Sequence, residues 1–219
     1  MATHVPGTAN ADDVPRLAEC ARAFERKLQG IEHDLDPEWR EALRPTWPFL
    51  EGLPAGVPRQ QLVSRLLVTQ MGGLPALERL LDPAARLVLL ERPALLSRLC
   101  MLALARRPGM LRCCIERPVR QALMGALDED FDVLMRLTLA GAPFRHEATG
   151  WVPMQWACAG YFDWAALLVS GDGVLRRIAR LSLPRRLLRR VQELRPVPAQ
   201  LSSRRALAAL AEAGVAWPC

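Results

Sequence analysis

The first periodic part of the chain carries apolar residues at alternating spacings of three and four. They are Val14, Leu17, Ala21, Phe24, Leu28, Ile31 and Leu35. This spacing places them on one narrow stripe of a helix, which is typical of packing against a single partner helix. We expect the stripe to pack on the protein's own body, and docking onto another chain is the alternative. If the stripe docks onto another chain, the residues that contact that chain are Val14, Leu17, Phe24 and Leu28.

The segment 37–58 interrupts the helical pattern with five prolines. Each proline lacks an amide donor and restrains the residue before it, so no long helix is expected here. The segment is predicted to be a linker or an ordered loop. Its tryptophans, Trp39 and Trp47, favour anchoring of the loop on the core. A partner contact, with Trp39 as the candidate residue, is the alternative.

After this segment the sequence predicts a series of short helices that begin at prolines. Asp82-Pro83 is typical of an N-cap followed by proline at the first helical position. The recurring Arg-Pro steps predict that Pro93, Pro108 and Pro118 each lie in the first turn of a helix. Apolar residues cover most of the circumference of the helix behind Pro93, which predicts a central position for this helix.

Two clusters of unusual composition admit a functional interpretation. The acidic run at 128–132 is favoured as a helix start, because carboxylates there suit the helix dipole. A calcium loop, the alternative, would need alternating Asp residues and then a glycine. The aromatic residues of the segment 151–164 either fill the core or form a recognition surface, and we expect the core. They are Trp151, Trp156, Tyr161 and Trp164.

The segment 172–195 has eight arginines against two acidic residues. Its periodicity predicts two amphipathic basic helices that meet at Pro184. Four interpretations stay open: a solvated face, docking to an acidic protein surface, binding to anionic lipid, and nucleic-acid binding. Nucleic acid is disfavoured, because neither interleaved aromatics nor a polar recognition face accompanies the arginines. The candidate partner-binding residues here are Arg176, Arg177, Arg180, Arg185, Arg186, Arg189 and Arg190.

Composition narrows the class of protein. With 219 residues, 51% of them hydrophobic, the chain can form one sizeable core or two smaller ones. No apolar run reaches the length of a membrane span and no secretory signal is recognisable, so we expect a cytoplasmic location. Six cysteines without paired spacings predict free, mostly buried thiols rather than disulfides or a zinc site. The net charge is +6, and Lys27 is the only lysine.

Catalytic motifs are missing from the sequence. The three histidines, His4, His33 and His146, lie far apart in unrelated contexts. The chain contains no nucleophile elbow, no phosphate-binding loop and no zinc-protease motif. We therefore predict that the protein is not an enzyme and uses neither a cofactor nor a metal.

These observations predict an all-α fold: a compact bundle of about ten mostly short helices with no significant sheet. Residues 1–11 are expected to be disordered and residues 12–219 to form a single helical domain. Subdivision of that domain at the segment 37–58 or at 141–150 is open. A repeat array is disfavoured, because the two Glu-Arg-Pro segments agree only over their first turn.

The order of these features resembles a known family. An N-terminal amphipathic helix leads to the Pro37-Glu38-Trp39 step, and many short helices with a central "IERPVRQALMGAL" follow. A Trp- and Leu-rich segment then leads to "LSLP" at 181–184, beside the arginine-rich part. This order is similar to the SctK family, the accessory component of the bacterial type III secretion sorting platform.

The resemblance implies an all-helical cytoplasmic adaptor at the inner-membrane face of the secretion apparatus. Such an adaptor bridges the cytoplasmic domain of the inner-membrane ring to the pod protein of the platform. A bridge needs two separate patches, for which the stripe at 14–35 and the arginines at 176–190 are the candidates. A basic helical regulator that binds nucleic acid or an anionic membrane surface is the alternative function.

Overall fold

The computed structural model describes residues 13–113, 117–137, 142, 147–194 and 198–215. Over these ranges the regular elements are helices and no strand is present, which confirms the predicted all-α fold. The α-helices are α1 (Asp13–Gln29), α2 (Ile31–Asp34), α3 (Pro37–Leu43), α4 (Val57–Gln70), α5 (Pro83–Arg86), α6 (Arg92–Ala105), α7 (Pro108–Leu111), α8 (Arg117–Leu127), α9 (Asp130–Leu137), α10 (Pro153–Ala165), α11 (Gly173–Leu181), α12 (Arg185–Glu193) and α13 (Ser203–Glu212). The 3-10 helices are η1 (Arg44–Thr46), η2 (Pro48–Gly52), η3 (Leu77–Leu81), η4 (Leu87–Leu89), η6 (Glu147–Gly150) and η7 (Ser170–Asp172).

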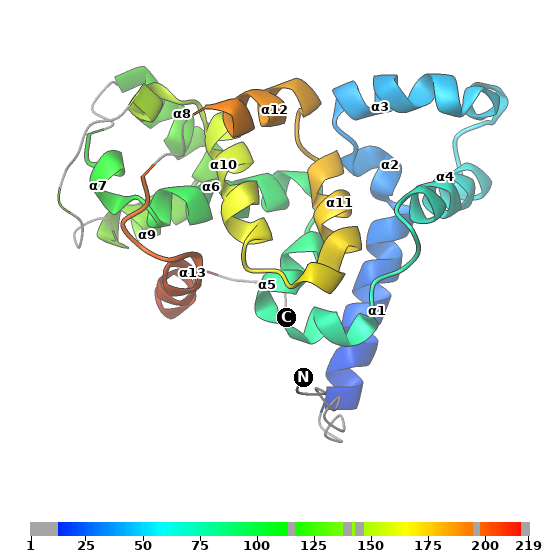
Figure 1. Ribbon diagram of the computed structural model, residues 1–219, viewed down its shortest axis with the longest axis horizontal. Helices are drawn as coiled ribbons and strands as arrows, with labels where there is room; N and C mark the ends of the chain where they lie inside the picture. Colours follow the sequence, from blue (N-terminus) through cyan, green and yellow to red (C-terminus); the bar gives the residue numbers. More distant parts are fainter. Residues whose placement is uncertain (1–12, 114–116, 138–141, 143–146, 195–197, 216–219) are drawn as a thin grey trace.

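The helices α6 and α10 cross at the centre of the molecule (Figure 1). In α6, Leu95, Leu99 and every residue from 100 to 105 are buried, so the helix has no solvent-exposed face over its second half. This confirms the central position that its apolar circumference predicts. Gly160 of α10 lies so close to the Leu99 carbonyl oxygen that a Cβ atom would overlap it. The closest approach of the two helices thus depends on a residue without a side chain.

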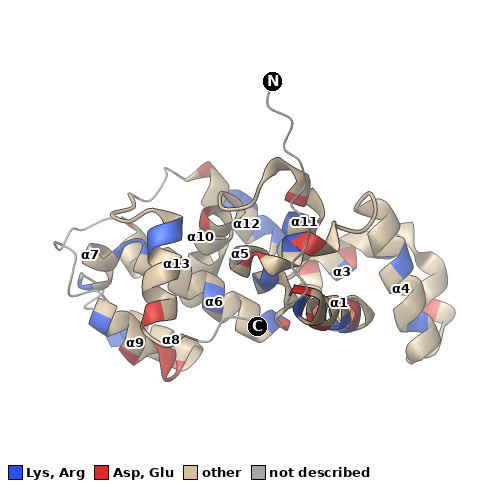
Figure 2. Ribbon diagram, turned by 90° about the horizontal axis from the view of Figure 1, so that it is seen from below, with Lys and Arg blue, Asp and Glu red and all other residues tan. Residues whose placement is uncertain are grey.

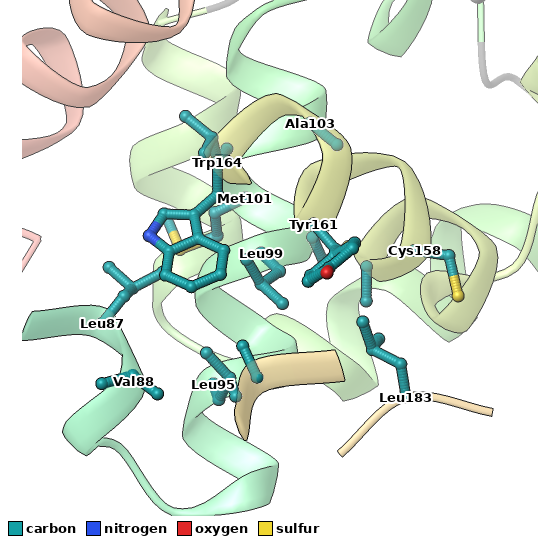
Figure 3. Close-up of a cluster of buried hydrophobic side chains, with 14 of the residues drawn as sticks. Leu87, Val88, Leu95, Leu99, Met101, Ala103, Cys158, Tyr161, Trp164 and Leu183 are labelled. Atoms are coloured by element: carbon teal, nitrogen blue, oxygen red, sulfur yellow. The ribbon is translucent and has the colours of Figure 1, made fainter. Parts of the chain in front are cut away.

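The aromatic cluster belongs to this core. Trp156 and Trp164 are fully buried and Tyr161 is nearly so. Figure 3 shows Trp164 and Tyr161 among leucines from α6 and η4. The Trp164 indole donates to the Ala84 carbonyl oxygen at 2.6 Å, and the Tyr161 hydroxyl donates to the Arg176 carbonyl oxygen at 3.2 Å. The predicted core role is therefore confirmed for Trp156, Tyr161 and Trp164, whereas Trp151 is partly buried and packs against this core.

Prolines start helices as predicted. Pro108 is the first residue of α7, while Pro93 and Pro118 are the second residues of α6 and α8. Asp82 caps α5 by accepting from the Ala84 amide at 2.9 Å. These positions need no intrahelical amide donor, so proline adds no unsatisfied group there.

The proline-rich segment 37–58 is an ordered loop with helical turns. Asp36 caps α3 by accepting from the Glu38 amide at 3.0 Å, and η1 and η2 follow. Trp47 is buried at the end of η1, which confirms that a tryptophan anchors this loop on the core. The predicted disordered segment 1–11 and half of the predicted break at 141–150 lie outside the described residues.

The apolar stripe of α1 packs mainly on the chain's own body. Phe24 and Leu28 are buried against η3, η4 and α4, and Leu17 is half-buried. Only Val14, at the start of α1, is largely exposed, with 59% of its surface accessible. Phe24 and Leu28 therefore serve the core, and the exposed part of the stripe is confined to its beginning.

A buried polar network joins the end of α1 to the start of α6. Lys27 is 5% exposed; its ammonium group pairs with Asp34 and donates to the Leu90 carbonyl oxygen. The other Asp34 oxygen accepts from the Arg92 amide at 2.8 Å. The Arg92 guanidinium bonds to Asp36 at 2.6 Å and to the Ser182 carbonyl oxygen at 3.0 Å. One network thus holds together α1, α2, α6 and the end of α11.

A second buried ion pair fastens α6 to α10. Asp163 of α10 is 6% exposed and accepts from both Arg106 and Arg107, which follow α6. The Arg107 guanidinium, itself 5% exposed, lies 2.6 Å from the Asp163 carboxylate and 2.8 Å from the Ala103 carbonyl oxygen. Buried charges are tolerated only when they are paired and hydrogen-bonded, as here.

The described cysteines are thiols that form no disulfide. Cys20, Cys100 and Cys158 are buried and Cys113 is partly exposed, whereas Cys114 and Cys219 lie outside the described residues. Burial raises the pKa of the Cys158 thiol to about 12, with a smaller effect of the Asp36 carboxylate, and burial also raises the pKa of Cys100.

In the folded protein, Cys100 and Cys158 should therefore resist iodoacetamide. At about pH 8, a pKa of about 12 instead of 9.0 lowers the reactive thiolate fraction of Cys158 about a thousand-fold. Mass spectrometry of native and guanidinium-unfolded protein measures the labelling rate of each cysteine, with Cys113 as the internal reference. Equal rates in both states would contradict the burial of these thiols.

The raised pKa of Cys158 also makes the stability of the fold depend on pH. Because the thiol ionises near pH 9 in the unfolded chain and near pH 12 in the folded protein, its contribution to the free energy of unfolding is lost as pH rises from about 9 towards 12.

Candidate functional site

The two predicted basic helices are present and meet at Pro184. Leu175, Ile178 and Ala179 form the buried face of α11. Leu188 and Val191 form the buried face of α12, which packs on α10. Each helix turns its arginine-bearing side outwards, and Figure 2 shows the basic segments of α11 and α12.

The arginines of α11 make contacts within the chain. The Arg176 side chain donates to the Leu168 carbonyl oxygen at 2.6 Å, and that of Arg177 donates to the Met71 carbonyl oxygen at 2.6 Å. Arg180 lies over the ring of Trp39, 5.5 Å from its centroid. These three side chains therefore close the fold around α11 and are only partly available to another molecule.

Trp39 joins α3 to the junction of α11 and α12. Its indole nitrogen donates to the Leu183 carbonyl oxygen at 2.9 Å, and Arg185 lies over the ring at 5.3 Å from the centroid. The neighbouring Glu38 carboxylate accepts from the Arg186 amide at 2.7 Å, at the start of α12. A carboxylate there suits the positive end of the helix dipole. Trp39, predicted as a partner contact or a loop anchor, thus has an anchoring role.

The two helices that Trp39 joins, α3 and α12, form the walls of a groove of about 920 Å³. Both helices lie along the upper edge of the molecule in Figure 1. We call this the α3–α12 groove. It is lined by Pro37, Glu38, Glu41, Ala42, Arg185, Arg186, Arg189, Arg190 and Glu193.

Three arginines of this groove are unpaired. Arg186, Arg189 and Arg190 are exposed, and their guanidinium groups form no ion pair with any residue in the described ranges. Arg189 and Arg190 follow Arg186 by three and four residues, so each is a neighbour of Arg186 on the surface of α12. We call these three residues the α12 arginines. By contrast, Arg92, Arg98 and Arg107 each pair with an aspartate.

The structure thus divides the seven predicted arginines between two roles. Those of α11 bond to the chain itself, and the α12 arginines face solvent, with Arg185 taking part in both the Trp39 contact and the groove. The exposed start of α1 lies away from α12, at the opposite edge of Figure 1. The groove and the stripe at 14–35 are therefore separate surfaces.

The sequence analysis missed the glutamates of α3. Glu38 and Glu41 line the groove opposite the arginines. A spacing of three places both on one side of a helix, but no long helix was expected in this proline-rich segment and no short one was assigned. A capping signal was available, because Asp36-Pro37 matches the Asp82-Pro83 pattern that starts α5.

Other candidate sites are not supported. The acidic run at 128–132 leads into α9, which begins at Asp130, as the helix-start interpretation predicts. Asp130 also pairs with Arg98. Within the described residues, no group of His, Cys, Asp and Glu side chains could hold a metal ion. None of the helices in those ranges has both the length and the apolar character needed to cross a membrane.

Comparison with protein families places the chain in a wider context. The family model described as HrpB4, bacterial type III secretion protein, matches residues 12–214, which is nearly the whole chain. No curated protein and no solved structure matches the chain. The match agrees with the resemblance to a type III secretion accessory protein of the SctK kind. The chain therefore belongs to the HrpB4 family of bacterial type III secretion proteins.

Proposed function

We propose that this protein is a non-enzymatic adaptor of the type III secretion apparatus. It links the cytoplasmic domain of the inner-membrane ring to the pods of the sorting platform, at the cytoplasmic face of the inner membrane. Family membership supports a role in secretion. The observation that carries the adaptor role is the row of exposed α12 arginines without acidic partners in the described chain, a surface suited to binding another protein.

A role without catalysis fits the chemistry of the described residues. Cys100 and Cys158 are buried thiols with raised pKa values, so neither is an activated nucleophile. His33 is exposed on the short helix α2. The buried carboxylates Asp34 and Asp163 are engaged in ion pairs that hold helices together. These groups therefore support structural roles.

An adaptor needs a second surface. The start of α1 is the candidate, because Val14 is exposed and Leu17 is half-buried beside it. This apolar patch differs in chemistry from the α12 arginines and lies at the other edge of the molecule (Figure 1). Two partners could therefore bind at the same time without competing for one site.

Affinity purification of the tagged protein from its native host tests the proposal. We expect mass spectrometry to recover both the ring component and the pod component. A strain that lacks the pod protein should still yield the ring component, and a strain that lacks the ring component should still yield the pod protein. Recovery of nucleic acid or lipid in place of both proteins would overturn the adaptor role.

A further inference from the structure

We infer that the α3–α12 groove binds a partner helix that carries a row of carboxylates beside a row of basic side chains. The inference rests on the proposed adaptor function and specifies the chemistry of one partner. It depends on three properties of the groove, which are the unpaired arginines on one wall, the glutamates on the other, and the contacts that hold the two walls in place.

The arginine wall selects carboxylates. The guanidinium groups of Arg186, Arg189 and Arg190 form no ion pair with a carboxylate among the described residues. Residues three and four apart on α12 lie about 5–6 Å apart, which matches carboxylates one turn apart on a partner helix. A guanidinium group binds a carboxylate through two parallel hydrogen bonds, so this wall recognises acidic side chains.

The glutamate wall rejects a polyanion. Glu41 is exposed on α3, opposite the arginines, and Glu193 adds a carboxylate at the far end of the arginine wall itself. A phosphate backbone or an anionic bilayer presents continuous negative charge, part of which would face these carboxylates. Like charges at close range cost binding free energy, whereas a basic side chain facing Glu41 gains it. A helix with both signs of charge satisfies both walls.

The two walls are held in place before any partner binds. Leu188 and Val191 fix α12 on α10, and the Trp39 indole fixes α3 to Leu183. The Glu38 carboxylate bonds to the first turn of α12. A groove that is already formed loses little conformational freedom on binding, which favours affinity.

Binding to a synthetic peptide tests this inference. The probe is an alanine-based helical peptide with glutamates along one face and lysines along the adjacent face. Arg189→Glu/Arg190→Glu should weaken its binding about ten-fold or more, because two attractive contacts become repulsive. The matched control, Arg204→Glu/Arg205→Glu, makes the same charge change on exposed residues of α13 and should leave the affinity unchanged.

Glu41→Gln distinguishes a helical peptide with both signs of charge from a polyanion, because it should weaken binding of the peptide and strengthen binding of a polyanion. We expect this variant to weaken peptide binding about two- to five-fold, because the lysine face of the probe loses its carboxylate partner. Phosphatidylglycerol vesicles and duplex DNA are tested in parallel. Tighter binding of Glu41→Gln to the peptide, or tighter binding of wild-type protein to vesicles or DNA than to the peptide, would overturn the inference. Thermal unfolding by circular dichroism verifies that each variant is folded.

Affinity purification from the host tests the groove and the adaptor role independently. If the wild-type protein recovers the ring and pod components, Arg189→Glu/Arg190→Glu should lose one of them and retain the other. Recovery of both components by this variant would overturn the groove inference and leave the adaptor role intact. Failure of the wild-type protein to recover either component would overturn the adaptor role itself.

Discussion

Replacing Asp163 with alanine is expected to lower the free energy of unfolding by about 3–5 kcal/mol. The substitution removes the carboxylate that accepts from Arg106 and Arg107. Arg107 is only 5% exposed, so its charge would either stay buried without a counter-ion or move into solvent. The first outcome leaves an uncompensated buried charge and the second disrupts the packing around Arg107. Urea denaturation followed by circular dichroism measures the change.

Glu19→Gln is the control for this experiment. Glu19 is exposed in the middle of α1, so its neutralisation should change the free energy of unfolding by about 0.5 kcal/mol or less. Asp163→Asn keeps one acceptor oxygen and should fall between the two variants. A loss for Asp163→Ala no larger than that for Glu19→Gln would show that the ion pair does not fasten α6 to α10.

Gly160→Ala is expected to lower the free energy of unfolding by about 3 kcal/mol or more. Overpacking a core usually costs about 1–3 kcal/mol, and this site is among the tightest. The added Cβ atom would overlap the Leu99 carbonyl group, which is backbone and cannot rotate away. Relief requires α6 and α10 to separate, and their buried side chains would then lose contact along the whole crossing. Thermal and urea denaturation measure the loss.

Gly125→Ala is a matched control on α8. Apart from its chain neighbours and the nearby backbone of α8, no atom lies within 4 Å of a Cβ placed on Gly125, so the methyl group enters open space. Alanine in a helix is favoured over glycine by about 0.5–1 kcal/mol, so this variant should be slightly more stable than the wild type. A loss for Gly160→Ala no larger than any loss for Gly125→Ala would show that the close crossing of α6 and α10 does not determine the effect at Gly160.

Local chemistry explains why much of the fold could be predicted from sequence. A capping residue followed by proline acts within one turn, so Asp82-Pro83 and the Arg-Pro steps identify helix starts without knowledge of the rest of the chain. The apolar circumference of α6 similarly predicts burial, because no face of that helix is suited to water.

The proline-rich segment shows where such reasoning was incomplete. Five prolines predicted a linker or an ordered loop without a long helix, but short helices form there, because Pro37 and Pro48 occupy first positions of α3 and η2, where proline is tolerated. The described ranges contain thirteen α-helices, many of them short, where a bundle of about ten mostly short helices was predicted. Counting prolines is a poor guide when each one can begin a new short helix.

The candidate site could be predicted only in outline. Periodicity placed seven arginines on two basic helices but could not show which of them bond to the chain itself. Arg177 reaches the Met71 carbonyl oxygen, and Trp39 reaches the Leu183 carbonyl oxygen, across more than a hundred residues each. Backbone acceptors leave no signature in the sequence, because every residue type provides the same carbonyl group.

The burial of Lys27 has a consequence for mapping the assembly. It is the only lysine of the chain, and its ammonium group is enclosed by Asp34 and the Leu90 carbonyl oxygen. Amine-reactive cross-linkers, which join exposed lysines of neighbouring subunits, therefore find no accessible side chain on this protein. Reagents directed at carboxylates, or photoreactive residues introduced along α3 and α12, are the appropriate means of capturing its neighbours.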